Sequence, residues 1–256
     1  GSGIGRATSL ELARRGCTVA VADIDASRAE ETAALIRQLG RRASAHEVDV
    51  RDAEHVAALR QAVVDTHGEC HILVNNAGVT SAGVFADEST DDLRWIIDTN
   101  VWGVVNTTRA FLPDLHRVDE AHIVNLSSMV GLLGLPHNAS YALTKGAIRS
   151  FSEALRAELV TSRVAVTTVL PGSIRTAITD SARGTHGHVI ARLGRHRLSG
   201  LILRSPDAAA RRIVRGIERN RARVLIGADA RALDLIARVS PGRSGLLGRL
   251  TSRLVR

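Results

Sequence analysis

The sequence is poor in cysteine, in aromatic residues and in long apolar runs. Its 256 residues include two cysteines, two tryptophans, one tyrosine and three phenylalanines. Two cysteines, Cys17 and Cys70, cannot build a disulfide framework, so we expect a reducing, cytoplasmic compartment. So few rings provide no stacking platform for single-stranded nucleic acid, and no apolar run approaches the roughly 18 residues of a membrane span. We therefore expect neither a nucleic-acid partner nor a transmembrane segment.

Lysine is nearly absent as well. Lysine and arginine together number 34, and Lys145 is the single lysine among them. The single tyrosine, Tyr141, precedes it by four residues. In a chain that uses arginine almost everywhere, a lysine that persists indicates a position that arginine does not serve. The spacing places both side chains on one face of a helix.

Acidic residues are outnumbered, and the formal net charge is +8. Part of the excess lies in 229–256, where six arginines accompany only Asp229 and Asp234. Solvated helix faces are the usual explanation of such a run. A weak association of the basic tail, 240–256, with anionic lipid stays open as an alternative.

Apolar strands alternate with amphipathic helices along most of the chain. Apolar residues make up 45% of the sequence and charged residues 23%, as in a soluble globular protein. The alternation predicts an α/β fold, a doubly wound parallel sheet of Rossmann type in a single domain, 1–256. We expect a first helix that ends near Gly16, strands at 17–22, 43–48, 71–74, 121–126, 164–170 and 223–226, and helices at 26–39, 52–67, 89–112 (closed by Pro113), 140–161, 206–219 and 229–239.

The alternation is interrupted at 173–205. This segment mixes glycine, histidine and arginine with aliphatic residues and lacks a continuous apolar stripe. Such a segment is typical of a lid, and we expect 173–205 to order when ligand binds. Aliphatic residues of the lid and of the segment after Ser128 predict an apolar substrate pocket, lined by Val130, Leu132, Leu133, Leu135, His137, Ile174, Ile178, Val189, Ile190 and Leu193.

The chain opens on Gly1-Ser2-Gly3-Ile4-Gly5, directly before a helix. Glycines allow the close approach of a pyrophosphate, and the free N–H groups of a helix start attract it. The next strand ends at Asp23, where a carboxylate can accept hydrogen bonds from an adenosine ribose. Because Asp23 would repel a 2′-phosphate, these two features predict NAD rather than NADP.

Tyr141 and Lys145 form an acid–base pair on chemical grounds. A free tyrosine hydroxyl titrates near 10, and a neighbouring ammonium group favours the phenolate. We therefore expect a lowered pKa at Tyr141 and proton exchange with an alcohol near neutral pH. Ser127 and Ser128 follow the strand at 121–126, and ligands bind at the carboxyl ends of strands in open parallel sheets.

Together these segments resemble the classical short-chain dehydrogenase/reductase family. The opening resembles the end of the family's TGxxxGxG loop, and the further matches are Asn75-Asn76-Ala77-Gly78, Asn100, Asn125-Leu126-Ser127-Ser128, Tyr141-x-x-x-Lys145 and Pro171-Gly172. The matches follow the family's order over most of the chain. The resemblance implies a seven-stranded sheet, an NAD(P)-dependent oxidoreductase acting on a small-molecule secondary alcohol or ketone, and a homo-oligomer, commonly a tetramer.

The resemblance also implies a role for each residue. Tyr141 is the general acid–base, Lys145 tunes it, and Ser128 holds the substrate oxygen. Asn100 holds a water that connects Lys145 to solvent. The cofactor site that the resemblance implies consists of Ser2, Gly3, Ile4, Gly5, Asp23, Asp49, Val50, Asn76, Ala77, Gly78, Tyr141, Lys145, Pro171, Gly172 and Thr176.

In the family's topology, a further strand precedes the glycine loop and lies between the strands expected at 17–22 and 71–74. That strand and the first glycine of the loop are missing from 1–256. We therefore expect a gap at this place in the sheet and roughly 10–20 further residues upstream in the natural chain. We also expect that 1–256 alone is not a stable NAD-binding enzyme, because interior strands would keep unpaired N–H and C=O groups.

Other interpretations stay open. Arginines of the lid (Arg183, Arg192, Arg195, Arg197 and Arg204) fit an NADPH-dependent 3-oxoacyl reductase, against which Asp23 argues. A catalytically silent NAD-binding sensor would have no need of the four predicted catalytic residues. His186-Gly187-His188 has no accompanying cysteine or carboxylate cluster, so we expect no metal site.

Overall fold

Parallel strands form the centre of the fold. The computed structural model describes residues 1–174, 178, 182–185 and 204–240. In these residues β1 pairs with β2, and a second sheet has the order β3-β4-β5-β6. All pairings are parallel. The strands are β1 (Val19–Asp23), β2 (Ala43–Glu47), β3 (Ile72–Asn75), β4 (Ala121–Leu126), β5 (Val164–Pro171) and β6 (Arg223–Ile226).

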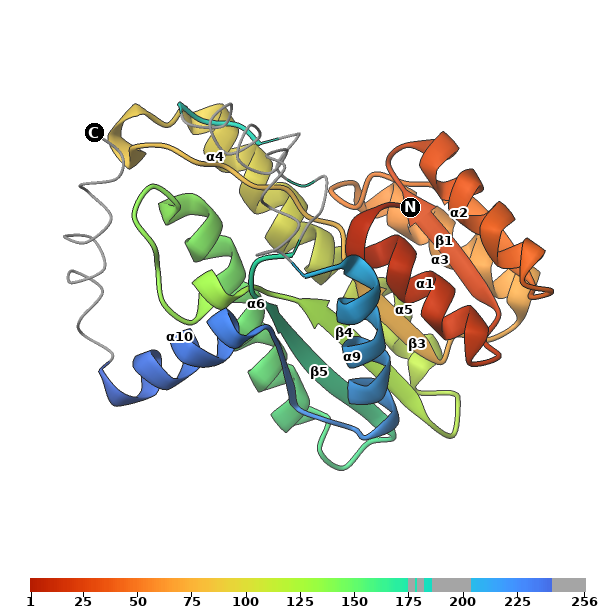
Figure 1. The fold of residues 1–256 in the computed structure, drawn as a ribbon. Coiled ribbons are helices and arrows are strands. Elements are labelled where there is room, and N and C mark those ends of the chain that lie inside the picture. Colours follow the sequence, from red (N-terminus) through yellow and green to blue (C-terminus); the bar gives the residue numbers. More distant parts are fainter. Residues whose placement is uncertain (175–177, 179–181, 186–203, 241–256) are drawn as a thin grey trace.

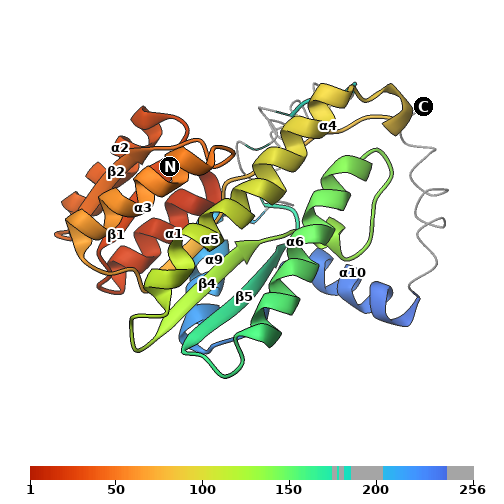
Figure 2. The same cartoon turned by 180° about the vertical axis from the view of Figure 1, so that it is seen from behind.

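Helices cover both faces of the strands. They are α1 (Gly3–Arg14), α2 (Ala26–Gln38), α3 (Ala53–His67), α4 (Thr90–Ile97), α5 (Gly103–Leu115), α6 (Ala139–Glu158), α9 (Pro206–Glu218) and α10 (Ala228–Val239). Short turns lie at Phe85–Asp87, Asp98–Trp102 and Met129–Gly131. Figure 1 shows α1 and α9 in front of the strands, and Figure 2, the view from behind, shows α3, α5 and α6 in front of the opposite face.

The core explains why the strands are almost continuously apolar. Every residue of β4 is buried. Ile123 packs in a cluster with Phe111 and Leu155 on one face, whereas Val124 packs in a cluster with Ile213 on the other. A parallel strand that is covered by helices on both faces buries successive side chains in two layers.

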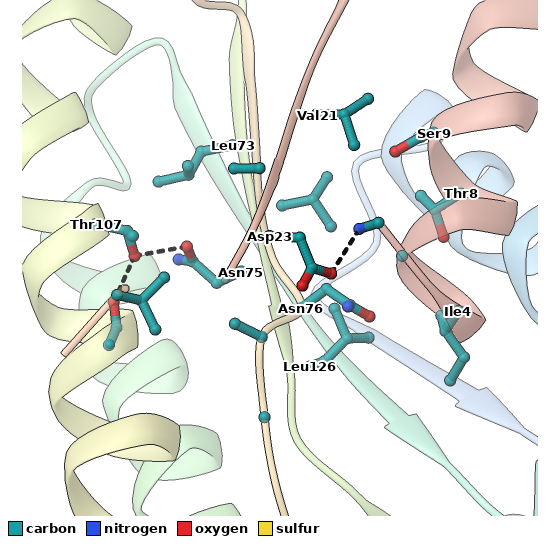
Figure 3. Close-up of a pocket in the computed structure, with 18 of the residues that line it drawn as sticks. Ile4, Thr8, Ser9, Val21, Asp23, Leu73, Asn75, Asn76, Thr107 and Leu126 are labelled. Atoms are coloured by element: carbon teal, nitrogen blue, oxygen red, sulfur yellow. Dashed lines mark hydrogen bonds and ion pairs between the residues drawn. The ribbon is translucent and has the colours of Figure 1, made fainter. Parts of the chain in front are cut away.

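A gap separates β1 from β3. In the described part of the chain, β1 pairs only with β2, and β3 pairs only with β4. A cavity of about 1000 Å³ includes this space, and Val21 and Leu73 line it. Figure 3 shows both side chains there. The gap lies where the resemblance places a further strand.

Secondary structure follows the sequence prediction closely, with one correction. The helix expected at 89–112 is divided: α4 ends at Ile97, a π-helical turn spans Asp98–Trp102, and α5 follows. Pro113 was expected to close the helix, but it lies inside the last turn of α5, which continues to Leu115. The proline removes one intrahelical hydrogen bond, the one that its nitrogen would have donated to the carbonyl four residues earlier, and α5 ends two residues later.

Some predictions fall outside the described residues. They are most of the lid at 173–205, including Thr176, and nearly all of the tail at 240–256. None of the described helices combines the length and the apolar character that are needed to cross a bilayer.

Candidate active site

The cavity extends to the carboxyl ends of β1, β3, β4 and β5. Ser128 lines it. It is also lined by nearly all residues that the sequence predicts to bind a dinucleotide, namely Ser2, Gly3, Ile4, Gly5, Asp23, Asp49, Val50, Asn76, Ala77, Gly78, Tyr141, Lys145, Pro171 and Gly172. The fold therefore gathers onto one surface segments that are far apart in the sequence.

The start of α1 fits an anionic group. Ser2 is the N-cap without a side-chain hydrogen bond, and the first turn has no acidic residue. The first N–H groups of a helix have no intrahelical partner, and the helix dipole favours an anion beside them. Gly3 has a φ of +52°, which favours glycine. A Cβ on Gly5 would lie 2.6 Å from Nδ2 of Asn76, so the loop lies directly against β3's end.

Asp23 ends β1 beside this loop. Its Oδ1 accepts a hydrogen bond from the N–H of Asp25 at 3.0 Å. Its Oδ2 lies 3.1 Å from the Gly1 nitrogen, the contact that is dashed in Figure 3. Arg28 lines the same part of the cavity, but its Nε lies 3.1 Å from the Asp25 carboxylate. The Asp23 carboxylate is thus fixed beside the anion-binding loop, where ribose hydroxyls could donate to it.

The turn after β2 is anchored on α5. Hydrogen bonds from Arg51, with Nε at 2.9 Å, hold the pKa of the Asp49 carboxyl below its usual value. Asn106 donates to the Val50 carbonyl at 3.1 Å. Gly103 leaves room for the Val50 side chain, which a Cβ there would strike. These contacts fix Asp49 and Val50 in the cavity wall.

Asn75 belongs to a buried polar network behind the cavity. Its Nδ2 donates to Oδ1 of Asn125 at 2.8 Å. Its Oδ1 accepts from Thr107 at 2.7 Å (Figure 3). Asn125 in turn donates to Ser152 at 2.9 Å. The network joins β3 and β4 to α5 and α6, so it fixes the two strand ends relative to the helix that carries Tyr141.

Tyr141 and Lys145 project from α6 towards the end of β4. The Lys145 Nζ lies 5.7 Å from the centre of the Tyr141 ring and donates to the Leu126 carbonyl at 2.9 Å. The Ser128 side chain lies close enough to the Tyr141 hydroxyl to favour its phenolate, and both side chains line the cavity. Ser127 has a different place, because its hydroxyl donates to the Lys145 carbonyl at 2.6 Å. The three polar groups predicted to act on substrate therefore lie together.

Burial dominates the titration of this pair. It raises the pKa of Tyr141 to about 12, although the hydrogen bond from Ser128 works in the opposite direction. It lowers the pKa of Lys145 to about 8. The expected lowering of the Tyr141 pKa is thus wrong for this structure, because desolvation of the phenolate outweighs the attraction of the ammonium group.

Asn100 lies in the π-helical turn and is 1% exposed. Its Nδ2 donates to the Val79 carbonyl at 2.9 Å and to Thr144 at 3.0 Å, and its Oδ1 accepts from the Val79 N–H at 2.8 Å. A Cβ on Gly78 would lie 3.2 Å from this Oδ1 and 3.3 Å from the Lys145 Nζ. Asn100 is therefore a close neighbour of Lys145, and its water-holding role stays a prediction.

Asp229 is a residue that sequence reasoning did not single out as part of the site. Its Oδ2 accepts a hydrogen bond from the N–H of Ser173 at 2.6 Å. Ser173 follows Pro171 and Gly172, which line the cavity. No sequence signal connects the two, because 56 residues separate them.

A described piece of the predicted lid is attached to the cavity wall. The Arg183 guanidinium lies 4.1 Å from the centre of the Trp95 ring and 3.3 Å from the Asp92 carboxylate. Trp95 lines the cavity. Of the residues that the structure describes, no three histidine, cysteine or acidic side chains gather as metal ligands. His186 and His188 lie outside those residues.

Comparisons with known proteins agree on one family. The family model for short chain dehydrogenases matches residues 1–187. A Mycobacterium tuberculosis protein named SadH is 39% identical over 241 residues, which are 93% of this chain and 87% of that protein. Oxidoreductase UcpA of Escherichia coli is 37% identical over 180 residues, which are 70% of this chain and 68% of UcpA.

Solved structures show the same likeness. A short chain dehydrogenase/reductase from Burkholderia phymatum in complex with NAD has a TM-score of 0.86 and 26% identity, and the match covers 94% of this chain and 90% of that one. A short chain dehydrogenase from Burkholderia cenocepacia in complex with NADP has a TM-score of 0.76 and 28% identity, with 90% and 94% covered. Relatives of this fold therefore bind either dinucleotide.

Proposed function

The chain belongs to the short chain dehydrogenase family and is an oxidoreductase, and on that premise we propose that it transfers a hydride between NAD and a secondary alcohol or ketone with an apolar body. The observation that carries this proposal is the position of Tyr141, Ser128 and Lys145 on the wall of the cavity that begins at the α1 N-terminus. One end of that cavity suits a pyrophosphate and the other suits acid–base chemistry.

The residues of the site divide the work. When bound, the oxidised dinucleotide supplies a hydride acceptor at its nicotinamide C4 and a positive charge that favours the Tyr141 phenolate. The N–H groups of the α1 start hold the pyrophosphate, and Asp23 accepts hydrogen bonds from the ribose. Pro171 and Gly172 form the wall of the nicotinamide half.

Tyr141 moves the proton. Because Ser128 and Tyr141 both line the cavity and Ser128 lies close enough to favour the Tyr141 phenolate, a substrate oxygen placed against both is held by two groups. Tyr141 takes the hydroxyl proton during oxidation and returns it during reduction. The Lys145 ammonium stabilises the phenolate by its charge, and Ser128 stabilises the substrate oxygen by hydrogen bonding.

The carboxylate of Asp23 supports NAD as the cofactor. A 2′-phosphate in the same place would be repelled by about 1–4 kcal/mol. One observation favours the alternative, NADP, because Arg28 lines the same part of the cavity. Arg28 is however drawn towards Asp25. An NADPH-dependent 3-oxoacyl reductase is thus the second candidate function.

A substrate panel tests the proposal. Secondary alcohols of increasing aliphatic length are assayed with NAD and with NADP, and 3-oxoacyl thioesters with NADH and NADPH. We expect NAD-dependent oxidation that improves with apolar length and is lost in Tyr141→Phe. Turnover of thioesters with NADPH alone would support the second candidate, and NAD binding without any turnover would support a sensor.

A further inference from the structure

The turn after β5 is held by an acidic side chain near the start of α10. Pro171 pairs with Ile226 at the end of β6, and the N–H of Gly172 donates to the Ile226 carbonyl at 2.8 Å. The next N–H, that of Ser173, donates to Asp229 at 2.6 Å. Pairing with β6 thus ends at Gly172. At Ser173 the N–H donates to the Asp229 side chain, and the carbonyl accepts from the Arg204 N–H at 3.1 Å.

The Asp229 carboxylate is enclosed between two glycines. A Cβ on Gly172 would collide with it, and so would a Cβ on Gly227, which also has a φ of +116°. Asp229 is the second residue of α10, whose N-cap is Gly227. The carboxylate therefore occupies a space that exists because neither neighbour has a side chain.

The charge on Asp229 is compensated locally. Burial raises the pKa of this carboxyl, but hydrogen bonds from the N–H groups of Ser173 and Ala230 outweigh burial and hold it below its usual value. The carboxylate thus joins two sets of donors, the free N–H groups of the α10 start and the turn after β5. Helix α10 also packs against β6 and the Met129–Gly131 turn, so the helix that carries Asp229 is itself held in place by the rest of the domain.

We propose that Asp229 is a positioning residue that holds the Pro171–Gly172–Ser173 turn against the nicotinamide half of a bound dinucleotide. The inference rests on the proposed function, because it is the dinucleotide site that gives the position of this turn a chemical consequence. Asp229 lies behind the turn, and it acts through the Ser173 N–H rather than by contact with substrate.

The test compares Asp229→Ala with Asp229→Asn and with a matched control, Asp207→Ala. Asp207 is the second residue of α9, as Asp229 is of α10, and it is exposed. Its removal takes away the same favourable charge at a helix start without touching the turn. Asparagine at 229 keeps an oxygen that can accept from Ser173. Asp229→Asn should therefore keep most of the Ser173 protection and of the NADH affinity that Asp229→Ala loses.

Two measurements are made on each variant. Hydrogen exchange of the Ser173 amide reports the tether in the protein alone. Calorimetric titration with NADH and with ADP-ribose, which lacks nicotinamide, reports the two halves of the site separately. For Asp229→Ala we expect faster exchange at Ser173, NADH binding weakened about tenfold and ADP-ribose binding kept within roughly twofold. Asp207→Ala should change none of them.

Two results would overturn the proposal. One is unchanged exchange at Ser173 in Asp229→Ala, and the other is an equal loss of NADH and ADP-ribose binding, which would make Asp229 a general structural residue. If the full-length wild type binds neither ligand, the dinucleotide function fails and the positioning role fails with it, whereas the exchange data still report whether the tether exists.

Discussion

The Lys145 ammonium lies beside the Tyr141 ring, 5.7 Å from its centre, and donates to the Leu126 carbonyl. This relationship differs from a direct ammonium–hydroxyl contact. The charge influences the phenol through space while its hydrogen bond ties α6 to the end of β4. Lys145 is buried and Tyr141 is half-buried. Desolvation therefore works against the charged form of each: Tyr141 has a pKa of about 12 and Lys145 one of about 8.

The tyrosine titration can be measured directly, because Tyr141 is the only tyrosine. We expect the phenolate absorbance of the protein without dinucleotide to appear with a pKa above 10, towards 12. The unfolded chain deprotonates first, near 10, so stability should fall as the pH rises from 10 to 12. The unfolded protein in denaturant is the control, and a folded-state midpoint below 10 would contradict the burial argument.

Tyr141→Phe should remove turnover and keep cofactor binding. The ring and its packing remain, whereas the proton carrier is lost. Turnover should fall by about 10²–10⁴-fold, with the dissociation constant of NAD nearly unchanged. Steady-state assays and NAD titration measure the two quantities. Retention of most of the activity would show that another group carries the proton.

Lys145→Met should separate catalysis from stability. At pH 7 the wild type keeps a charged ammonium at a site that is 4% exposed, and burial disfavours that charge. We expect the variant to melt no lower than the wild type at pH 7 while turnover is lost. The pKa of Lys145 is about 8 in the folded protein and 10.5 ordinarily. Between these two pH values the free energy of unfolding of the wild type should therefore rise relative to that of the variant.

Lys145→Arg serves as the companion variant. It keeps the charge, but its wider fork must fit between Gly78 and the α6 backbone, so it should lower both stability and turnover. A fully active Lys145→Arg enzyme would show that a point charge alone suffices.

Asp23→Ala should relax the preference for NAD. Removing the carboxylate removes the repulsion of a 2′-phosphate, so NADP binding should improve while NAD binding weakens. Asp25→Asn is the companion variant. Asparagine keeps the N-cap of α2 but removes the charge that holds Arg28, so a gain in NADP binding in this variant would come from Arg28 and not from the loss of Asp23. Dissociation constants for both dinucleotides decide the matter, and tighter NADP binding by the wild type would refute the assignment.

His122 should make the protein sensitive to acid. It is buried in β4, its Nε2 lies 2.7 Å from the Thr167 hydroxyl, and burial lowers its pKa to about 4. Between pH 6.5 and 4 the unfolded chain binds the extra proton, so stability should fall as pH falls through this window, by up to about 3 kcal/mol.

The His122 effect is read as a difference. His46 and His67 also have lowered pKa values, so the wild type is compared with His122→Gln in thermal melts from pH 7 to 4. The difference in melting temperature between the wild type and His122→Gln should become smaller as the pH falls. Parallel curves would show that His122 contributes nothing to acid sensitivity.

Much of the fold was accessible from the sequence, because it rests on local patterns. Gly16, Gly40 and Gly68 all have positive φ values after helices, where the sequence places helix ends. The apolar runs became parallel strands, of which β4 is buried throughout and β5 at all but one residue. The prediction failed locally at 89–112, because the π-helical turn that contains Asn100 is stabilised by Val79 and Thr144, which lie far from it in the sequence.

By itself the sequence determined the element order, the family resemblance and the identity of the groups that can do chemistry, since spacing and side-chain type suffice for these. Only the tertiary structure decided how those groups behave. Burial set the direction of the Tyr141 and Lys145 pKa shifts against the simple charge argument, because desolvation depends on everything that surrounds a group. The bond between Asp229 and Ser173 likewise exists only because adjacent strands β5 and β6 bring their carboxyl ends together, and no local pattern records that proximity.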